Sequence, residues 1–187
     1  MANRLEIRLA GSGGQGLIMA GMILAEAAGI HEGKFVTQTQ SYGPEARGGA
    51  SKSEVVVSDE EIDYPPAMKP DILLCMNQAA CDTYIFDVKP GGRLIVDSSL
   101  VHSLPTTRAI GLPFTKVARE EVGQEMMANI VALAALATLT GVVSRESLEE
   151  AVLARVPKGT EALNRQAVEA GVKLAQEWME QKKLPES

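Results

Sequence analysis

A glycine-rich segment near the amino terminus carries the strongest chemical signal in the sequence. It matches the pattern G-x-G-x-x-G and consists of Gly11, Ser12, Gly13, Gly14, Gln15 and Gly16. Glycines let the backbone turn tightly and approach an anion closely, while the amides of a following helix point toward that anion. Three interpretations stay open: a dinucleotide site, close packing of a helix on a strand, and an anion or a partner's backbone held at the loop.

The dinucleotide interpretation requires an acidic residue at the end of the second strand, where it holds a ribose hydroxyl. That strand is predicted to end in Gln38, Thr39, Gln40 and Ser41, and none of these is acidic. No arginine follows immediately to bind a 2′-phosphate. The sequence therefore disfavours NAD(P), and a freestanding nucleotide-binding protein that uses GSGGQG is kept only as the alternative function.

A second bent segment, residues 41–49, reads SYGPEARGG. Its glycines and its proline bend and stiffen the chain, and Arg47 offers a guanidinium fork that suits a carboxylate or a phosphate. Alternatively, Glu45 and Arg47 bond only with local backbone, and Tyr42 is a core aromatic. The candidate binding residues of this segment are Ser41, Tyr42, Gly43, Glu45, Arg47, Gly48 and Gly49.

The remaining reactive residue types do not form a catalytic or metal-binding set. Cys75 lies in an apolar run and is predicted to be a small buried hydrophobe, and Cys81 lies on a predicted helix without a cationic neighbour. Two cysteines cannot hold an iron–sulfur cluster of four thiolates, and the two histidines are far apart. We therefore predict no catalytic residues and no metal ligands on this chain. Core filling is the expected role of four methionines, Met19, Met22, Met126 and Met127.

Strands that alternate with helices are predicted to position the two segments. Apolar runs and alternation predict strands at 4–10, 35–40, 50–58, 71–76, 93–96 and 109–117. Helical periodicity and caps predict helices at 17–28, 77–86, 124–139, 145–157 and from 161. The opening forms a Rossmann-like, right-handed βαβ unit, and the strand at 50–58 is expected to run antiparallel because its link is short. The chain is expected to form one domain, residues 1–187, with three α/β/α layers around a mixed, mostly parallel sheet.

The carboxyl ends of parallel strands meet at one edge of such a sheet, where open α/β sheets bind ligands. The glycine loop and the second segment each follow a strand, so we expect them to meet at this edge. Polar residues that follow the later strands belong to the same predicted edge: Asn77, Gln78, Asp97 and Ser98.

Composition excludes several classes of function. The 187 residues are 45% hydrophobic and 22% charged, which is typical of a globular protein. A net charge of −6, without a run of lysine and arginine, disfavours nucleic acid as a partner. The most apolar stretch, 128–143, is shorter than the ~20 residues that cross a bilayer, and the amino terminus does not read as a signal peptide. We expect a cytoplasmic protein with no membrane and no nucleic-acid partner.

Three stretches of this sequence resemble a known family. They read GSGGQG, QTQSYGPEARGGASKSEVVVSDEEIDYP and EVGQEMMANIVALAAL, and the resemblance extends from Leu5 to about Trp178. The combination is similar to the gamma subunits of 2-oxoacid:ferredoxin oxidoreductases. Within that family, SYGPEARGG is more similar to the 2-oxoglutarate enzymes than to the pyruvate enzymes, and ketoisovalerate enzymes are close relatives. The resemblance implies the fold of the third domain of pyruvate:ferredoxin oxidoreductase.

The resemblance also implies a role inside a larger enzyme. Such a holoenzyme decarboxylates a 2-oxoacid with thiamine diphosphate and magnesium, passes electrons through iron–sulfur clusters to ferredoxin, and gives the acyl group to coenzyme A. Alpha and beta subunits bind the thiamine diphosphate, and a ferredoxin-like delta subunit carries clusters. The gamma chain binds no cofactor alone, has no independent activity, and faces these partners through the two glycine-bearing segments. Asn129 is implied to be structural, and an isolated chain can form a homodimer through its uncovered apolar surface.

Overall fold

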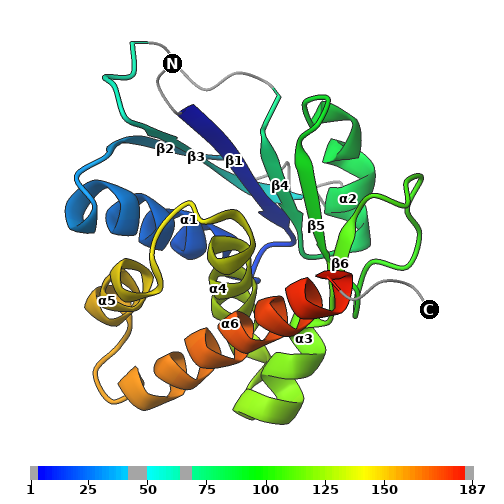
Figure 1. Cartoon of the computed structure of the whole chain (residues 1–187). Coiled ribbons are helices and arrows are strands. Elements are labelled where there is room, and N and C mark those ends of the chain that lie inside the picture. Colours follow the sequence, from blue (N-terminus) through cyan, green and yellow to red (C-terminus); the bar gives the residue numbers. More distant parts are fainter. Residues whose placement is uncertain (1–3, 42–49, 64–68, 184–187) are drawn as a thin grey trace.

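The computed structural model describes residues 4–41, 50–63 and 69–183, and Figure 1 shows the arrangement of its elements. A six-stranded sheet has the order β2-β3-β1-β4-β5-β6. Its strands are β1 (Arg4–Gly11), β2 (Phe35–Ser41), β3 (Ser51–Ser58), β4 (Ile72–Cys75), β5 (Arg93–Asp97) and β6 (Ile110–Leu112). The α-helices of the described residues are α1 (Leu17–Glu26), α2 (Gln78–Tyr84), α3 (Phe114–Val117), α4 (Ala128–Thr140), α5 (Arg145–Arg155) and α6 (Glu161–Lys183).

The directions of the strands confirm the predicted mixed sheet. β1, β4, β5 and β6 are parallel neighbours, and β3 runs antiparallel to both β1 and β2. The antiparallel direction of β3 follows from the short link after β2, which leaves no room for a helical crossover. The strands of the predicted βαβ unit, β1 and β2, therefore point the same way, but β3 lies between them. The βαβ pattern does not anticipate this insertion.

Helices cover both faces of the sheet, which confirms the predicted α/β/α architecture (Figure 1). α1 packs across β1, β2 and β3, and α4, α5 and α6 extend the layer on that side. The larger cluster of buried residues joins these helices to the sheet and includes Ile7, Leu74 and Leu133. On the opposite face α2 packs on the sheet, with Ala80 against a smaller cluster that contains Leu73. One face of the sheet therefore carries most of the helical core.

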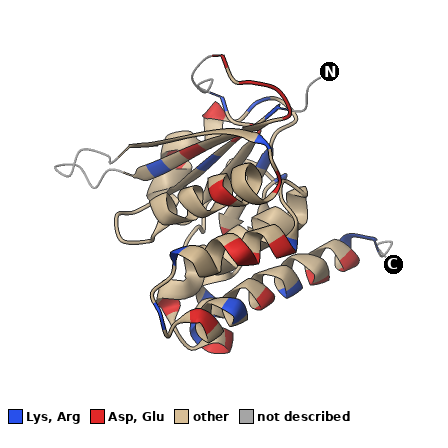
Figure 2. Ribbon diagram, turned by 90° about the vertical axis from the view of Figure 1, so that its left-hand side faces the viewer, with Lys and Arg blue, Asp and Glu red and all other residues tan. Residues whose placement is uncertain are grey.

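α4 is buried on nearly every side because α1, α3 and α6 all pack against it. Its residues are mostly alanine and branched aliphatics, as the apolar run predicts. α6 crosses it closely at Gly171, where a Cβ would lie 2.2 Å from the carbonyl oxygen of Val131. Acidic and basic residues alternate along the exposed positions of α6 (Figure 2). Within the described ranges, no helix combines the length and the apolar character needed to cross a membrane.

The strand predicted at 109–117 is wrong in its second half. β6 ends at Leu112, and Phe114 begins the short helix α3. Pro113 lies between them with a φ of −84° and has no amide hydrogen with which to extend the ladder. The proline therefore ends the strand and leads the chain into a helix.

The boundaries of the carboxy-terminal helices are close to those predicted. The long helix expected at 124–139 begins at Ala128, because Glu125–Met127 form a separate 3-10 turn. Ser144 caps α5 as predicted: its Oγ accepts a hydrogen bond from the amide of Ser147 at 3.1 Å.

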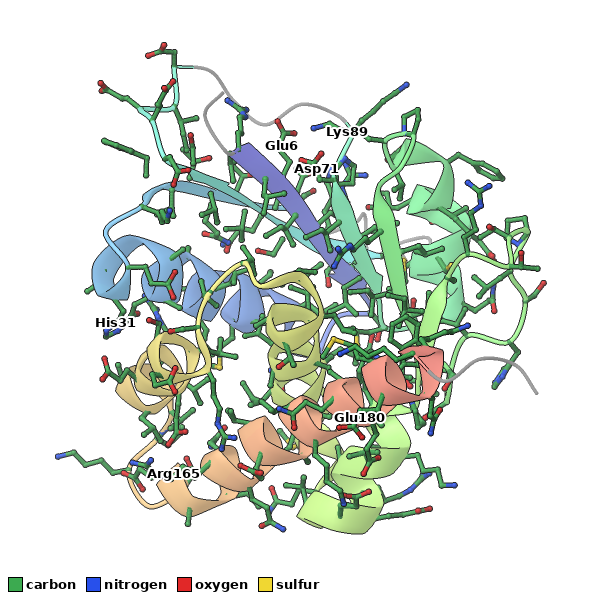
Figure 3. The ribbon with its side chains drawn as sticks, in the orientation of Figure 1. Glu6, His31, Asp71, Lys89, Arg165 and Glu180 are labelled. Carbon is green, nitrogen blue, oxygen red and sulfur yellow. The ribbon has the colours of Figure 1, made fainter. Side chains whose placement is uncertain are left out.

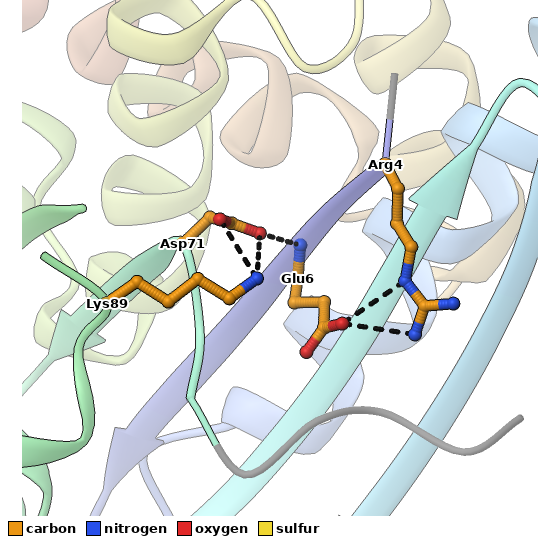
Figure 4. Close-up of polar contacts among 4 residues, drawn as sticks. All are labelled: Arg4, Glu6, Asp71 and Lys89. Atoms are coloured by element: carbon orange, nitrogen blue, oxygen red, sulfur yellow. Dashed lines mark hydrogen bonds and ion pairs between the residues drawn. The ribbon is translucent and has the colours of Figure 1, made fainter. Parts of the chain in front are cut away.

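Polar contacts fasten the ends of β1 and β4 that lie opposite the glycine loop. The Asp71 carboxylate accepts hydrogen bonds from the amide of Glu6 at 2.8 Å and from Nζ of Lys89 at 3.1 Å, and Arg4 lies 3.0 Å from the Glu6 carboxylate (Figure 4). Figure 3 shows Glu6, Asp71 and Lys89 together at the end of the sheet where β1 begins. These contacts hold two adjacent strands in register at the edge remote from the candidate site.

Candidate functional site

The glycine loop, residues 11–16, lies at the carboxyl end of β1 and leads into α1, as predicted. The Gln15 side chain folds back across it. Gln15 Oε1 accepts a hydrogen bond from the amide of Ser12 at 2.8 Å, and Nε2 donates one to the carbonyl of Met76 at 3.2 Å. Since Met76 directly follows β4, Gln15 joins the loop to the neighbouring parallel strand. Both ends of the Gln15 amide are therefore used within the chain.

Gly16 starts α1 in a conformation that favours glycine, with a φ of 71°. A Cβ there would also lie 2.5 Å from Nδ2 of Asn129. That Nδ2 donates a hydrogen bond to the carbonyl of Gly16 at 3.2 Å, which joins the start of α1 to the start of α4. The structural role implied for Asn129 is confirmed.

Gly13 differs from Gly11 and Gly16. Its φ lies outside the left-handed region, its residue is exposed, and an added Cβ would meet nothing within 4 Å among the described atoms. At Gly11, in contrast, a Cβ would lie 2.4 Å from Oε1 of Gln15. Close packing therefore explains the glycines at 11 and 16, but it gives no reason for glycine at 13. Among the described residues, nothing covers the backbone at Gly13.

Most of the second predicted segment lies outside the described residues, namely Tyr42, Gly43, Glu45, Arg47, Gly48 and Gly49. The strands on either side of it are placed. Ser41 is exposed and ends β2 opposite Lys52, while Ser51 begins β3 opposite Gly11. Ser51 Oγ donates a hydrogen bond to the carbonyl of Gly11 at 3.4 Å. Both ends of the segment are thus attached at the edge of the sheet that carries the glycine loop.

The later strands bring Asn77, Gln78 and Asp97 to the predicted edge, but their side chains bond within the chain. Asn77 Oδ1 caps α2. Gln78 Oε1 accepts a hydrogen bond from the amide of His102 at 2.9 Å. The fully buried carboxylate of Asp97 accepts one from the amide of Thr115 at 3.1 Å. These three side chains are thus used within the chain. Ser98, the fourth residue predicted at this edge, is exposed, and its amide donates a hydrogen bond to the carbonyl of Leu112 at 3.0 Å. The candidate binding elements of the edge are therefore the two glycine-bearing segments and Ser98.

A hollow of about 200 Å³ opens beside the glycine loop. Its position is a topological switch point, because β1 leads to a helix on one face of the sheet and β4 leads to a helix on the other. Open α/β sheets bind their ligands in the crevice at such a point. The lining residues are Gly14, Gln15, Met76, Leu100, Thr115, Glu125, Met126 and Ala128.

The prediction that four methionines fill the core is wrong for three of them. Met127 packs against the core, but Met126 is 80% exposed, and Met19 and Met22 are exposed as well. Both exposed methionines belong to α1, whose Ile23 is fully buried. Met126 lies in the 3-10 turn before α4 at the rim of the hollow. Methionine is as apolar as leucine in a sequence pattern, so only the packing shows which side of an element it occupies.

Cys75 and Cys81 lie in the smaller apolar cluster beneath α2, and both are free thiols. Cys75 is buried as predicted, and Cys81 is 1% exposed, so neither thiol is open to solvent. The hydrogen bond between them, together with burial, raises the pKa of the Cys75 thiol above its usual range, and the same hydrogen bond lowers the pKa of Cys81. In the part of the chain that the structure describes, no three or more His, Cys, Asp and Glu residues are grouped to hold a metal ion.

The sheet order also weighs against a dinucleotide at the glycine loop. In dinucleotide-binding folds the second strand pairs directly with the first and supplies the carboxylate for the ribose. Here β3 separates β1 from β2, so the end of β2 lies about 10 Å from β1 rather than about 5 Å. The residue opposite Gly11 is Ser51 of β3, which has no carboxylate.

Comparison with known proteins identifies the family. The family described as pyruvate ferredoxin/flavodoxin oxidoreductase matches residues 6–174. Over 178 residues the chain is 53% identical to 2-oxoglutarate synthase subunit KorC of Methanocaldococcus jannaschii. The match covers 93% of this chain and 95% of that subunit. The gamma subunit of a keto/oxoacid ferredoxin oxidoreductase from Geobacter sulfurreducens has a TM-score of 0.83 at 51% identity, over 92% of this chain and 99% of that one. This chain belongs to the pyruvate ferredoxin/flavodoxin oxidoreductase family.

A longer relative contains the same fold within a larger polypeptide. The 2-oxoglutarate:ferredoxin oxidoreductase from Magnetococcus marinus was solved with 2-oxoglutarate, coenzyme A and succinyl-CoA bound. It has a TM-score of 0.81 at 26% identity, and the match covers 93% of this chain but 31% of that chain. The matching region of that relative is therefore joined to further polypeptide in the same chain. None of these similarities supports a freestanding nucleotide-binding protein.

Proposed function

We propose that this chain is the gamma subunit of a 2-oxoglutarate:ferredoxin oxidoreductase. The observation that carries the proposal is its similarity, above 50% identity over nearly the full length, to a KorC subunit and to a solved gamma subunit. In the reaction the bond between C1 and C2 of the 2-oxoacid breaks and carbon dioxide leaves. The acyl group passes to the sulfur of coenzyme A, and two electrons pass to ferredoxin.

In this proposal the partner subunits carry out the chemistry. Alpha and beta subunits bind thiamine diphosphate and its magnesium ion, and a delta subunit holds iron–sulfur clusters. The chain has only two cysteines, both buried, whereas such a cluster needs about four thiolates. That donor set supports placing the clusters on another subunit. Two free thiols also suit a complex that works in the reducing cytoplasm.

The gamma chain contributes a shaped surface to the complex. We take residues 1–187 as one gamma domain whose glycine-loop edge faces the thiamine-binding subunits. The open backbone at Gly13 and the guanidinium of Arg47 supply hydrogen-bond donors there, for a partner's backbone or for an anionic group of the cofactor or coenzyme A. Support comes from Ser51 opposite Gly11, which attaches the second segment at the same edge as the loop. An added Cβ at Gly13 or Gly14 would meet nothing within 4 Å among the described residues, so both positions leave room for the approaching group.

Purification of the complex tests this function. The chain is tagged in its native host, and the proteins that co-purify are identified by mass spectrometry. We expect a thiamine-binding subunit and a ferredoxin-like subunit, with ferredoxin reduction that depends on coenzyme A and is fastest with 2-oxoglutarate. Faster reduction with pyruvate or 2-oxoisovalerate would correct the substrate. Recovery of the tagged chain alone, without a thiamine-binding subunit, would contradict the function itself.

A further inference from the structure

Gln15 has the only long side chain in the glycine loop, and both ends of its amide are bonded to backbone. Oε1 accepts a hydrogen bond from the amide of Ser12 at 2.8 Å, and Nε2 donates one to the carbonyl of Met76 at 3.2 Å. A backbone hydrogen bond of 3.3 Å, from the amide of Gln15 to the carbonyl of Ser12, closes the same turn. Gln15 therefore holds the turn together and also ties it to the chain that follows β4.

The strands and the first glycine of the loop leave space for this amide. β1 and β4 are paired as far as Ala10 and Cys75, and the amide of Met76 donates to the carbonyl of Ala10 at 2.9 Å. This pairing places Met76 beside the start of the loop. A Cβ at Gly11 would lie 2.4 Å from Oε1 of Gln15. Glycine at position 11 therefore makes room for the Gln15 amide.

The bonds of Gln15 restrain the two exposed glycines in the middle of the loop. Gly13 and Gly14 lie between Ser12 and Gln15, which are bonded to each other through both backbone and side chain. Fixing the residues on either side restrains the direction of the Gly13 and Gly14 amides. Backbone amides that are already ordered bind a hydrogen-bond acceptor more tightly than amides that must first be ordered.

We infer that Gln15 is a positioning residue, which holds the glycine loop in the conformation that the assembled enzyme needs. Its amide is used within the chain, so the loop's backbone, and not Gln15, meets the group that approaches. The inference rests on the proposed function, in which that group is a hydrogen-bond acceptor of a partner's backbone, of the cofactor or of coenzyme A. A side-chain amide suits this role because it has an acceptor and a donor side by side.

Gln15→Glu tests the inference through pH. A neutral carboxylic acid has one donor and one acceptor and can replace both bonds, whereas a carboxylate has acceptors alone and is repelled by the Met76 carbonyl. That repulsion and partial burial favour the neutral form, as does Glu125, which lines the same hollow as Gln15 and lies 3.5 Å from the Arg119 guanidinium. The pKa of the introduced carboxyl should therefore lie above its usual value of about 4.3. Lower pH should restore the loop.

The variants are prepared in the tagged complex, and the coenzyme A-dependent reduction of ferredoxin is divided by that of the wild type at each pH. The temperature is kept well below the melting of every variant, and equal amounts of assembled complex are compared. We expect Gln15→Glu to be about tenfold slower than the wild type at about pH 8 and to recover most of this loss by about pH 6. Gln15→Leu, which loses both bonds, should be slow at both pH values.

Gln176→Glu is the matched control, because it makes the same chemical change at an exposed position of α6. It should equal the wild type at every pH. The quantity that recovers with falling pH in Gln15→Glu then locates the acceptor. Recovery of the KM for coenzyme A places it on coenzyme A, and recovery of kcat alone places it on the cofactor. Recovery of the thiamine-binding subunit per gamma chain places it on the partner's backbone. Each of the three supports the positioning role.

Three results would overturn the inference. The first is a ratio for Gln15→Glu that does not change with pH, and the second is full turnover by Gln15→Leu. The third is a lower melting temperature with unchanged turnover per assembled complex, which would show that Gln15 acts on stability alone. A wild-type chain that recovers no thiamine-binding subunit would instead contradict the proposed function.

Discussion

Gly13 and Gly16 stand three residues apart in one loop, yet different physical causes apply to them. Gly16 has a φ of 71° and faces Asn129, so the fold itself demands glycine there. Gly13 meets no described atom that a side chain would displace. If its glycine matters, the cause lies outside the described residues, and we expect it to be another polypeptide or a cofactor that approaches the loop. We therefore expect a substitution at Gly16 to affect the stability of the fold, and a substitution at Gly13 to affect the assembled complex.

Substitution by alanine tests this separation. We expect Gly13→Ala to change the free energy of unfolding by less than about 1 kcal/mol, but to lower the turnover of the complex several-fold. Gly16→Ala should lower the free energy of unfolding by about 1–3 kcal/mol, because alanine is strained at a positive φ. Denaturant unfolding and the coenzyme A-dependent assay measure the two quantities. Full turnover by Gly13→Ala would remove Gly13 from the partner-facing surface.

The thiols of Cys75 and Cys81 give a second prediction for single residues. Both are buried, and the pKa of Cys75 is raised, so we expect neither to react with an exposed-thiol reagent at neutral pH within minutes. Both should react once the chain is unfolded in denaturant. Rapid reaction of one thiol in the folded chain would indicate that Cys81, whose pKa is lowered, becomes accessible.

At the scale of elements, the crossing of α4 and α6 determines how the helical layer packs on the sheet. Ala, Leu, Ile and Val cover every side of α4, so it needs neighbours all around. At Gly171 the two helices approach so closely that a Cβ would lie 2.2 Å from the Val131 oxygen and 2.8 Å from Cβ of Ala134. Because α4 also holds Asn129 against Gly16, this packing supports the end of the glycine loop, where α1 begins.

Gly171→Ala should therefore destabilise the protein, although alanine is normally about 1 kcal/mol better than glycine inside a helix. We expect a loss of about 1–3 kcal/mol from overpacking at the crossing. Gln176→Ala is the control, since Gln176 is an exposed position on α6. Thermal or denaturant melts compare the two. A stabilised Gly171→Ala variant would show that the helices separate at little cost.

For the whole molecule, the order of the strands decides which ligands the loop can take. The insertion of β3 moves β2 away from β1 and puts Ser51 opposite the glycine loop. It also brings both ends of the segment between β2 and β3 to that edge. The same insertion that disfavours a dinucleotide therefore attaches both ends of a second glycine-bearing segment at the edge that carries the first.

Calorimetric titration with NAD⁺ and NADP⁺ tests this consequence of the topology. We expect no heat of binding at micromolar concentrations, because no residue at the described end of β2, from Gln38 to Ser41, has a carboxylate for the ribose. The complex is titrated alongside the isolated chain, so that a site formed only on assembly is also detected. Micromolar binding to the isolated chain would favour the nucleotide-binding alternative.

Local sequence features determined much of this fold. Alternation and apolar runs located the strands, and Ser144 marked the start of α5, because such signals depend on neighbours a few residues away. The antiparallel direction of β3 followed from the length of one link. The sequence of the glycine-bearing segments also predicted the similarity to gamma subunits, and the comparisons confirm the family.

Tertiary structure alone decided the features that depend on residues far apart in the chain. β3 lies between β1 and β2. Local sequence patterns do not distinguish this pairing of strands from the other possible pairings. The exposure of Met126 depends on which elements cover the turn before α4. The residue type alone does not predict whether an apolar side chain will be buried or exposed. Likewise, Gln15 is committed to Met76, 61 residues away, because β1 and β4 are neighbours in the sheet.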